Sequence, residues 1–174
     1  MIKYILFLTA LYGTPLNFNE DDCHEHFTIY LVRHAEKNLS SANSSDPELT
    51  PCGEQRAEGL KVFFSSIEID KVYSTKAVRA KSTAQPTATS KGVEIVEYNS
   101  DNLEDFAKQL LHNKEDALVV GHNHTTAVLA GLLVGQDLGE IPLDEYDRIY
   151  QVAFVRKKGH LCLFRSPFQC LEVK

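Results

Sequence analysis

A short run of β-branched and aromatic residues constrains the fold of this chain more than any other segment. Residues 28–32 (Thr-Ile-Tyr-Leu-Val) have almost no polar face, and the run stops at Arg33 and His34. A strand that is apolar on both faces is typical of the centre of a sheet that helices cover on each side. Open α/β sheets bind their ligands just beyond the carboxyl ends of such strands. Arg33 and His34 therefore predict an anion site that contains a nucleophile.

A second segment repeats this arrangement later in the chain. The apolar run of residues 117–120 ends at Gly121 and His122. We expect Gly121 to let the backbone turn sharply, and Thr125 or Thr126 to cap the helix that follows. A single histidine beside a strand is more often structural. Two histidines in the same context, one of them preceded by an arginine, favour a functional site.

A third element, between these two, supplies another arginine. Residues 72–74 are expected to end a strand, and the helix that follows contains Arg79. At ~3.6 residues per turn, Arg79 would lie about one and a half turns into that helix, from where its side chain could reach over the edge of the sheet. Taken alone, this segment reads more readily as a solvated helix face.

The order of the elements predicts a single α/β domain. Strands and helices alternate along most of the chain, which is typical of a doubly wound, mostly parallel sheet with helices on both faces, three layers in all. The C-terminal part has the pattern of an antiparallel hairpin at one edge. The other expected elements are a helix over residues 51–65 with Thr50 as its N-cap, a strand over residues 93–97, helices over residues 103–112 and 125–133, and a hairpin of residues 149–156 and 160–165 joined by residues 157–159.

In their order and motifs these elements resemble the histidine phosphatase superfamily, which has the phosphoglycerate-mutase-like fold. The matching motifs are Arg33-His-Ala-Glu36, Leu49-Thr-Pro-Cys-Gly-Glu-Gln-Arg-Ala57, Val72-Tyr-Ser-Thr with Arg79 and Thr83-Ala84, and Val119-Val-Gly-His122. The resemblance runs over residues 27–165 and is strongest to the small single-domain phosphatases, including the phosphohistidine phosphatases. It implies that His34 is the nucleophile and that Arg33, Arg79 and His122 bind the phosphoryl group.

The chemistry of these four residues agrees with that resemblance. A phosphoryl group in transfer carries negative charge, and its enzymatic transfer depends mostly on positioning and charge stabilisation. An arginine fork matches two phosphate oxygens at once. A neutral imidazole is a competent nucleophile near neutral pH, because its unperturbed pKa is about 6.5. We therefore expect a phosphatase that hydrolyses a phosphomonoester or phosphoramidate through a phosphohistidine on His34, without a cofactor.

The proton donor for the leaving group is less evident. Larger members of the family carry a carboxylic acid on an insertion after the second arginine, whereas this chain offers only residues 92–114. Glu97 and Asp101 are the best placed there, although each reads more readily as a surface charge. Without an acid, phosphohistidine, acyl and aryl phosphates become the favoured substrates. The alternatives are therefore a phosphohistidine-protein phosphatase, or a weakly active module that binds phospho-ligands.

Two segments are expected to frame the mouth of the pocket, namely residues 38–48 and 135–150. Tyr146, in the second segment, is expected to pack rather than to contact substrate. His124 is either a rim residue or an exposed neighbour of the helix cap. A zinc site at His122 and His124 is disfavoured, because no cysteine or carboxylate stands at ligand spacing, and we expect no metal.

Composition and charge limit the partners. The chain has 174 residues, enough for one domain, and a net charge of −6 without a basic stripe, which disfavours nucleic acid. The sequence contains neither a Walker motif nor the cysteine–arginine signature of the cysteine phosphatases. The expected partner is a phosphorylated small molecule or a phosphoprotein. The sequence gives no indication of oligomeric state.

The N-terminus of the chain suggests export. Lys3 and the apolar residues 4–11, too few to span a bilayer, resemble a signal peptide with a poor cleavage site. We expect residues 1–26 to be a leader with a linker, residues 27–174 to be the phosphatase domain, and the mature protein to be periplasmic or secreted, with no stable membrane association once the leader is cleaved. The alternative is a retained N-terminal strand or anchor, and a cytoplasmic protein.

The four cysteines are compatible with an oxidising compartment and allow three pairings. Cys162 and Cys170 flank the Ser166-Pro167 turn and are the expected bridge. Cys52, within the first turn of its helix, is expected to be an unreactive thiol, because nothing near it in the sequence acts as a base.

Overall fold

The strand that the sequence places inside the sheet does lie there. The computed structural model describes residues 26–168 and 170 of the chain. In it, β1 (His26–Arg33) has neighbouring strands on both sides, and Ile29 and Leu31 are fully buried. Burial on both faces of β1 follows from its sequence, which offers no polar face to solvent.

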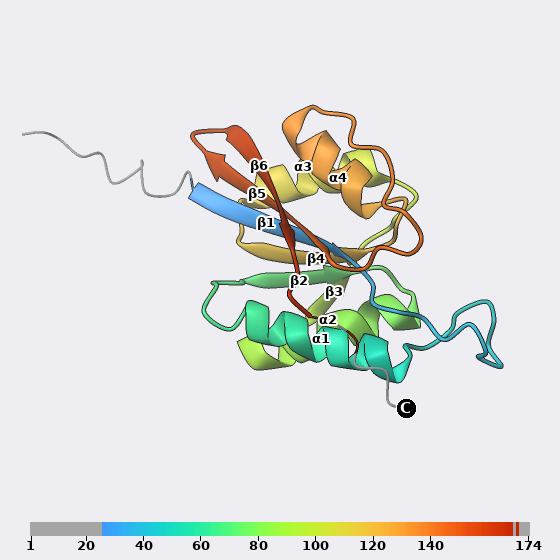
Figure 1. Ribbon diagram of the computed structural model, residues 1–174. Helices are drawn as coiled ribbons and strands as arrows, with labels where there is room; N and C mark the ends of the chain where they lie inside the picture. The colour runs from blue at the N-terminus through green and yellow to red at the C-terminus, as the bar shows by residue number, and fades with distance from the viewer. Residues whose placement is uncertain (1–25, 169, 171–174) are drawn as a thin grey trace, which may run out of the picture.

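The sheet has six strands in the order β3-β2-β4-β1-β5-β6 (Figure 1). β1 pairs in parallel with β4 on one side and antiparallel with β5 on the other, so the sheet changes direction at β1. This arrangement confirms the prediction of a mostly parallel sheet with a C-terminal hairpin at one edge. The other strands are β2 (Lys71–Ser74), β3 (Ile95–Glu97), β4 (Ala117–Gly121), β5 (Arg148–Val155) and β6 (Lys158–Arg165).

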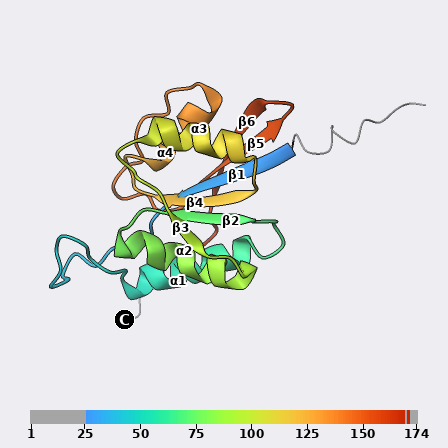
Figure 2. The same ribbon diagram turned by 180° about the vertical axis from the view of Figure 1, so that it is seen from behind.

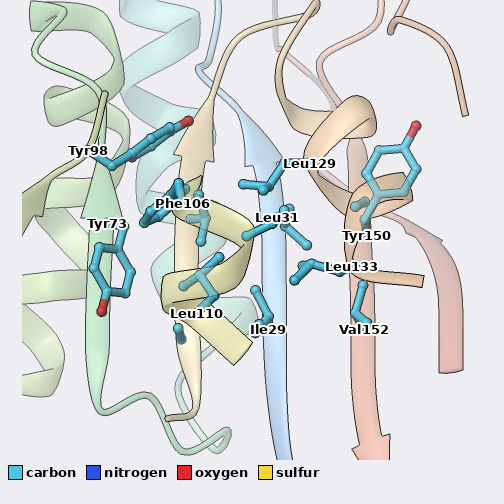
Figure 3. Packing of buried hydrophobic residues seen from close by; sticks show 14 of the residues in the cluster. Ile29, Leu31, Tyr73, Tyr98, Phe106, Leu110, Leu129, Leu133, Tyr150 and Val152 are labelled. Atoms are coloured by element: carbon cyan, nitrogen blue, oxygen red, sulfur yellow. The ribbon is translucent and has the colours of Figure 1, made fainter. Parts of the chain in front are cut away.

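Two helices cover each face of the sheet (Figures 1 and 2). α1 (Pro51–Phe63) and α2 (Val78–Lys91) lie on one face, and α3 (Leu103–Asn113) and α4 (Thr126–Val134) lie on the other. Each pair encloses its own apolar cluster against the sheet. Figure 3 shows the cluster on the face covered by α3 and α4, in which side chains of these two helices pack on those of β1.

The start of α1 and the end of α4 follow from local sequence. Thr50 is the N-cap of α1, and its Oγ1 accepts a hydrogen bond from the Gly53 N–H at 3.0 Å, as predicted. α4 ends at Gly135, whose φ of 69° places it in the left-handed region that glycine adopts at little cost.

The turn of the C-terminal hairpin is shorter than predicted. β5 ends at Val155 and β6 begins at Lys158, so the turn is Arg156-Lys157 and not residues 157–159. Both turn residues have positive φ, 49° and 68°. Two successive residues of this kind form the tight turn whose twist matches that of the two strands.

The expected disulfide is also wrong. Cys170 is bonded to Cys52, with Cα atoms 5.5 Å apart, and Cys162 is an exposed free thiol. Cys162 lies in β6, and the chain leaves the sheet after this strand and crosses to α1, where the Phe168 ring lies 5.0 Å from the guanidinium carbon of Arg56 (Figure 1). The pairing predicted from proximity along the sequence is therefore wrong. The prediction of an unreactive thiol at Cys52 is also wrong, because Cys52 is part of the disulfide.

The predicted leader lies outside the described residues, except for His26, which belongs to β1. Export and cleavage therefore stay predictions. None of the helices in the described part of the chain is long and apolar enough to cross a membrane.

Candidate active site

The carboxyl ends of β1 and β4 bring two histidines together. In the parallel register Arg33 pairs with Gly121, and the His34 N–H donates to the Gly121 carbonyl at 2.9 Å. The next residue after Gly121 is His122, so the two imidazoles meet edge to face, with ring centroids 5.3 Å apart and an angle of 67° between their planes. Residues that are far apart in sequence thus share one site because their strands are neighbours.

The role of Gly121 differs from the predicted one. Its φ is not in the left-handed region, so the backbone does not need glycine for a turn. A side chain would not fit, however, because a Cβ at this position would lie 2.7 Å from the hydroxyls of both Thr125 and Tyr98. Thr125 Oγ1 accepts from the His122 N–H at 2.8 Å instead of capping α4, so this hydroxyl holds the histidine in place.

One hydrogen bond fixes the tautomer of His34. Its Nδ1 lies 2.8 Å from the Ala35 carbonyl oxygen, which can only accept, so Nδ1 carries the proton. The lone pair is therefore on Nε2. The Ala35 N–H in turn donates to Thr83 Oγ1 at 2.9 Å, which anchors this loop to α2. His34 is only 3% exposed, so the ring is enclosed by the protein.

Both imidazoles are neutral near neutral pH. Burial lowers the pKa of His34 to about 3, and the positive charges of Arg79, His122 and Arg33 act in the same direction, against the Ala35 hydrogen bond. Burial and the charge of Arg79 lower the pKa of His122 to about 4. A neutral His34 retains the nucleophilic lone pair.

Arg79 occupies a different position in its helix from the one expected. α2 begins only at Val78, so Arg79 is its second residue, not one and a half turns inside. The start of α2 adjoins the two histidines, and His122 Nε2 lies 3.0 Å from Thr75 Oγ1 in the preceding loop. Arg79 Nη1 donates to Asp46 Oδ1 at 3.2 Å, and its buried Nε has no hydrogen-bond partner among the described residues.

Arg33 is engaged by a loop. Its Nη1 donates to the carbonyl oxygens of Pro142, Leu143 and Glu145 at 3.0, 2.9 and 2.9 Å. Its guanidinium carbon lies 4.0 Å from the centre of the Tyr146 ring, a cation–π contact. The guanidinium therefore organises the 142–146 loop as well as adding positive charge beside His34. Tyr146 packs as expected, and it also lines the cavity described next.

The four predicted residues share one cavity. Its volume is about 420 Å³, and Arg33, His34, Arg79 and His122 all line it. The mouth includes residues of both segments expected to frame it, among them Leu39 and Leu143, and also His124, whose ring stacks on His122 at 5.5 Å. A larger groove, about 1000 Å³, lies between α1 and α2 and contains none of these four residues.

Two carboxylates of this region were missed by the sequence analysis. Asp46 lines a second cavity, about 380 Å³, which shares Arg79 and His122 with the first. Glu36 accepts hydrogen bonds from Arg56 Nε at 3.0 and 2.9 Å and fixes the loop after His34 against α1. The Glu36–Arg56 pair could have been predicted, because Glu36 belongs to the motif Arg33-His-Ala-Glu36 and Arg56 belongs to the motif of the following helix. The sequence held no such signal for Asp46, because it lies in an irregular loop.

The candidate acids of the sequence analysis lie elsewhere. Glu97 is exposed and paired with Lys81, and Asp101 is exposed. Neither lines either of the two cavities. Among residues 26–168 and 170, no group of three His, Cys, Asp or Glu side chains is arranged to hold a metal ion.

Comparison with known proteins gives a family match over part of the chain and a fold. Residues 29–101 match the model of the histidine phosphatase superfamily (branch 1). No curated protein sequence matches the chain. Among solved structures, the protein histidine phosphatase SixA in complex with tungstate aligns with a TM-score of 0.65 and 16% identity, over 80% of this chain and 97% of that one.

Two other solved structures align equally well. The alpha-ribazole phosphatase of Shigella flexneri has a TM-score of 0.66 and 15% identity, over 80% of this chain and 96% of its own. The mycobacterial glucosyl-3-phosphoglycerate phosphatase has a TM-score of 0.65 and 12% identity, over 81% and 99%. At such identities the likeness is one of fold. The family match over residues 29–101 covers the part of the chain that contains Arg33, His34 and Arg79 and agrees with this fold.

Proposed function

We propose that this protein is a phosphatase that transfers a phosphoryl group first to Nε2 of His34 and then to water. One observation carries the proposal: His34 holds its lone pair on Nε2, inside a cavity that Arg79 and His122 also line. A neutral imidazole beside fixed cations is suited to attack on an anionic phosphorus.

The reaction has two steps. In the first, Nε2 of His34 attacks phosphorus, a P–N bond forms and the P–O or P–N bond to the leaving group breaks. In the second, water attacks the phosphohistidine, the P–N bond to His34 breaks and phosphate leaves. Arg79, His122 and Arg33 stabilise the charge on the phosphoryl oxygens in both steps, which is the main contribution of protein to this kind of transfer.

The substrate is a phosphomonoester or a phosphoramidate. The three similar structures are named for different substrates, a phosphohistidine protein among them, so the shared fold leaves the leaving group open. A second candidate, phosphohistidine on a protein, is favoured by the mouth of the cavity. Leu39 and Leu143 are 85% and 71% exposed there and could pack against a protein surface.

We also propose that the protein is exported. The apolar residues 4–11 resemble a signal peptide, and the bond between Cys52 and Cys170 is of a kind that persists in oxidising compartments.

The test is hydrolysis of p-nitrophenyl phosphate by the wild type, by His34→Ala and by His160→Ala. His160 is an exposed histidine of β6 and serves as the matched control. We expect His34→Ala to lose at least about 10³-fold in kcat/KM, as removal of a nucleophile does, and His160→Ala to match the wild type. Rapid acid-free quenching should trap a phosphoenzyme that is stable to base and labile to acid, in the wild type only. Equal activity of His34→Ala and wild type would overturn the proposal.

A further inference from the structure

Asp46 is the one carboxylate among the described residues that lines either of the two cavities at Arg79 and His122. The cavity in front of His34 is lined by cationic, apolar and neutral polar side chains. The neighbouring cavity, which shares Arg79 and His122 with it, contains Asp46. The negative charge of Asp46 is also close enough to raise the pKa of His122, against the larger effect of burial.

The carboxylate is held by the start of α2. The Val78 N–H donates to both oxygens of Asp46, at 3.0 and 3.2 Å, and Arg79 Nη1 donates to Oδ1 at 3.2 Å. Ala77, the N-cap of α2, has no side-chain hydrogen bond to offer, so Asp46 supplies the acceptor from a distant loop. The Asp46 side chain is still 34% exposed, which leaves it accessible from the cavity.

Proton donation is the one function that the four residues of the site do not provide. A leaving alkoxide or phenoxide needs a proton, and positioned carboxylic acids commonly supply it. His34 is the nucleophile, and Arg33 and Arg79 cannot release a proton at ordinary pH. His122, whose pKa burial lowers to about 4, is already neutral near neutral pH and is a poor proton donor. Glu97 and Asp101 line neither cavity, which leaves Asp46.

We infer that Asp46 is the general acid and base of the reaction, an inference that rests on the proposed function. In the first step its carboxyl proton passes to the oxygen of the leaving group as the P–O bond breaks, and a carboxylate remains. In the second step this carboxylate takes a proton from the water that attacks phosphorus. The P–N bond to His34 breaks, phosphate is released, and Asp46 is again protonated.

Substrate binding changes the contacts of Asp46. In the free protein Arg79 is its ionic partner, at 3.2 Å. A phosphate that takes over the fork of Arg79 withdraws that partner and leaves the carboxyl group of Asp46 beside the substrate. The proton that Asp46 transfers to the leaving group can come from the substrate monoanion or from solvent.

The experiment compares aryl phosphates of increasing leaving-group basicity, from p-nitrophenyl through phenyl to p-methoxyphenyl phosphate, with kcat/KM as the readout. Asp46→Asn retains an oxygen that can accept from Val78 and Arg79, so it removes the acidic proton and the charge of the carboxylate but keeps both hydrogen-bond contacts. We expect its activity on p-nitrophenyl phosphate to be nearly that of the wild type, and its activity on the two poorer leaving groups to fall by about 10²–10⁴-fold. Glu97→Gln is the matched carboxylate control and should follow the wild type throughout.

Each other outcome decides against Asp46. An equal loss on all three substrates would mean that Asp46 only positions Arg79. No loss on any, or a wild type whose kcat/KM already falls as steeply as that of Asp46→Asn, would mean that no acid acts here. The proposed function fails independently, through activity that survives His34→Ala, and the two failures are therefore distinguishable.

Discussion

The two histidines of the site are buried, and burial outweighs the nearby negative charge of Asp46, so the protein should be less stable in acid. In the folded protein their pKa values are about 3 for His34 and about 4 for His122, whereas an unfolded chain binds the proton near its unperturbed value, about 6.5. Between these values the unfolded state binds more protons than the folded state. The free energy of unfolding must therefore decrease as the pH falls from about 6.5 towards 4.

This gives a prediction for pH-dependent stability. Each histidine should contribute up to about 1.4 kcal/mol per pH unit to the slope of the unfolding free energy in that window. Urea titrations between about pH 7 and pH 5 should give a shallower slope for His34→Gln and for His122→Gln than for the wild type. His160→Gln, on the exposed edge strand, should keep the wild-type slope. Parallel slopes for all four proteins would contradict the assigned burial of the two imidazoles.

At this scale the sequence predicts the residues that follow a regular strand and misses those in irregular loops. Arg33, His34 and His122 stand at strand ends, where the position of a side chain follows from the hydrophobic pattern. Asp46 reaches the site through a loop whose path depends on its contacts with the start of α2, and no local pattern records them. The engagement of Arg33 by three carbonyl groups was likewise not predictable, because those groups belong to the backbone of a distant loop.

Among the elements, α1 supports the catalytic loop by close contact. A Cβ added at Gly53, in the first turn of α1, would overlap the carbonyl oxygen of Glu36, two residues after His34. The helix can approach the loop this closely only because residue 53 has no side chain. The Glu36–Arg56 pair then ties the same two segments together.

We therefore predict opposite effects for two glycines of the same helix. Gly53→Ala should lower the unfolding free energy by about 1–3 kcal/mol, the usual range for overpacking, and should also lower kcat because the His34 loop moves. At Gly59 an added Cβ would meet only the Phe168 side chain, at 3.3 Å, which can shift. Gly59→Ala should be neutral or stabilising by up to about 1 kcal/mol, since alanine favours helix. Urea unfolding and p-nitrophenyl phosphate hydrolysis measure both effects, and equal losses in the two variants would refute the contact.

The sequence was a good guide to which elements exist and a weaker guide to where they begin. Thr50 marked the start of α1 because its hydroxyl makes a local cap. The start of α2 carries no such signal, since its N-cap is Ala77 and its acceptor is remote, and Arg79 was consequently placed too deep in the helix. In the hairpin, the turn was predicted at residues 157–159 because Gly159 can adopt positive φ at little cost. The turn lies at Arg156 and Lys157, which adopt positive φ values although neither is glycine.

At the scale of the whole molecule, the disulfide joins the C-terminal tail to the first helix. It connects Cys52 to Cys170 across 118 residues, and it holds Phe168 near Arg56 and Gly59. Closure of a loop this long restricts the unfolded chain, so reduction should lower the unfolding free energy by about 2–4 kcal/mol.

This prediction is tested by peptide mapping without reductant and by thermal unfolding. Mapping should find Cys52 linked to Cys170 and should find Cys162 labelled by a thiol reagent. Cys52→Ser should unfold at a lower temperature than the wild type, and Cys162→Ser at the same temperature. A bridge between Cys162 and Cys170 would contradict the Cys52–Cys170 bond and support the pairing predicted from sequence proximity.

The parallel pairing of β1 with β4 also determines when a growing chain can become active. By the time residue 115 has been made, the nucleophile and both arginines exist, but β1 still lacks the two strands that flank it in the sheet. His122 and the loop that engages Arg33 come later still. We therefore expect a nascent or truncated chain to be inert towards phosphorylated metabolites, and the proposed phosphatase activity to begin only when synthesis is nearly complete.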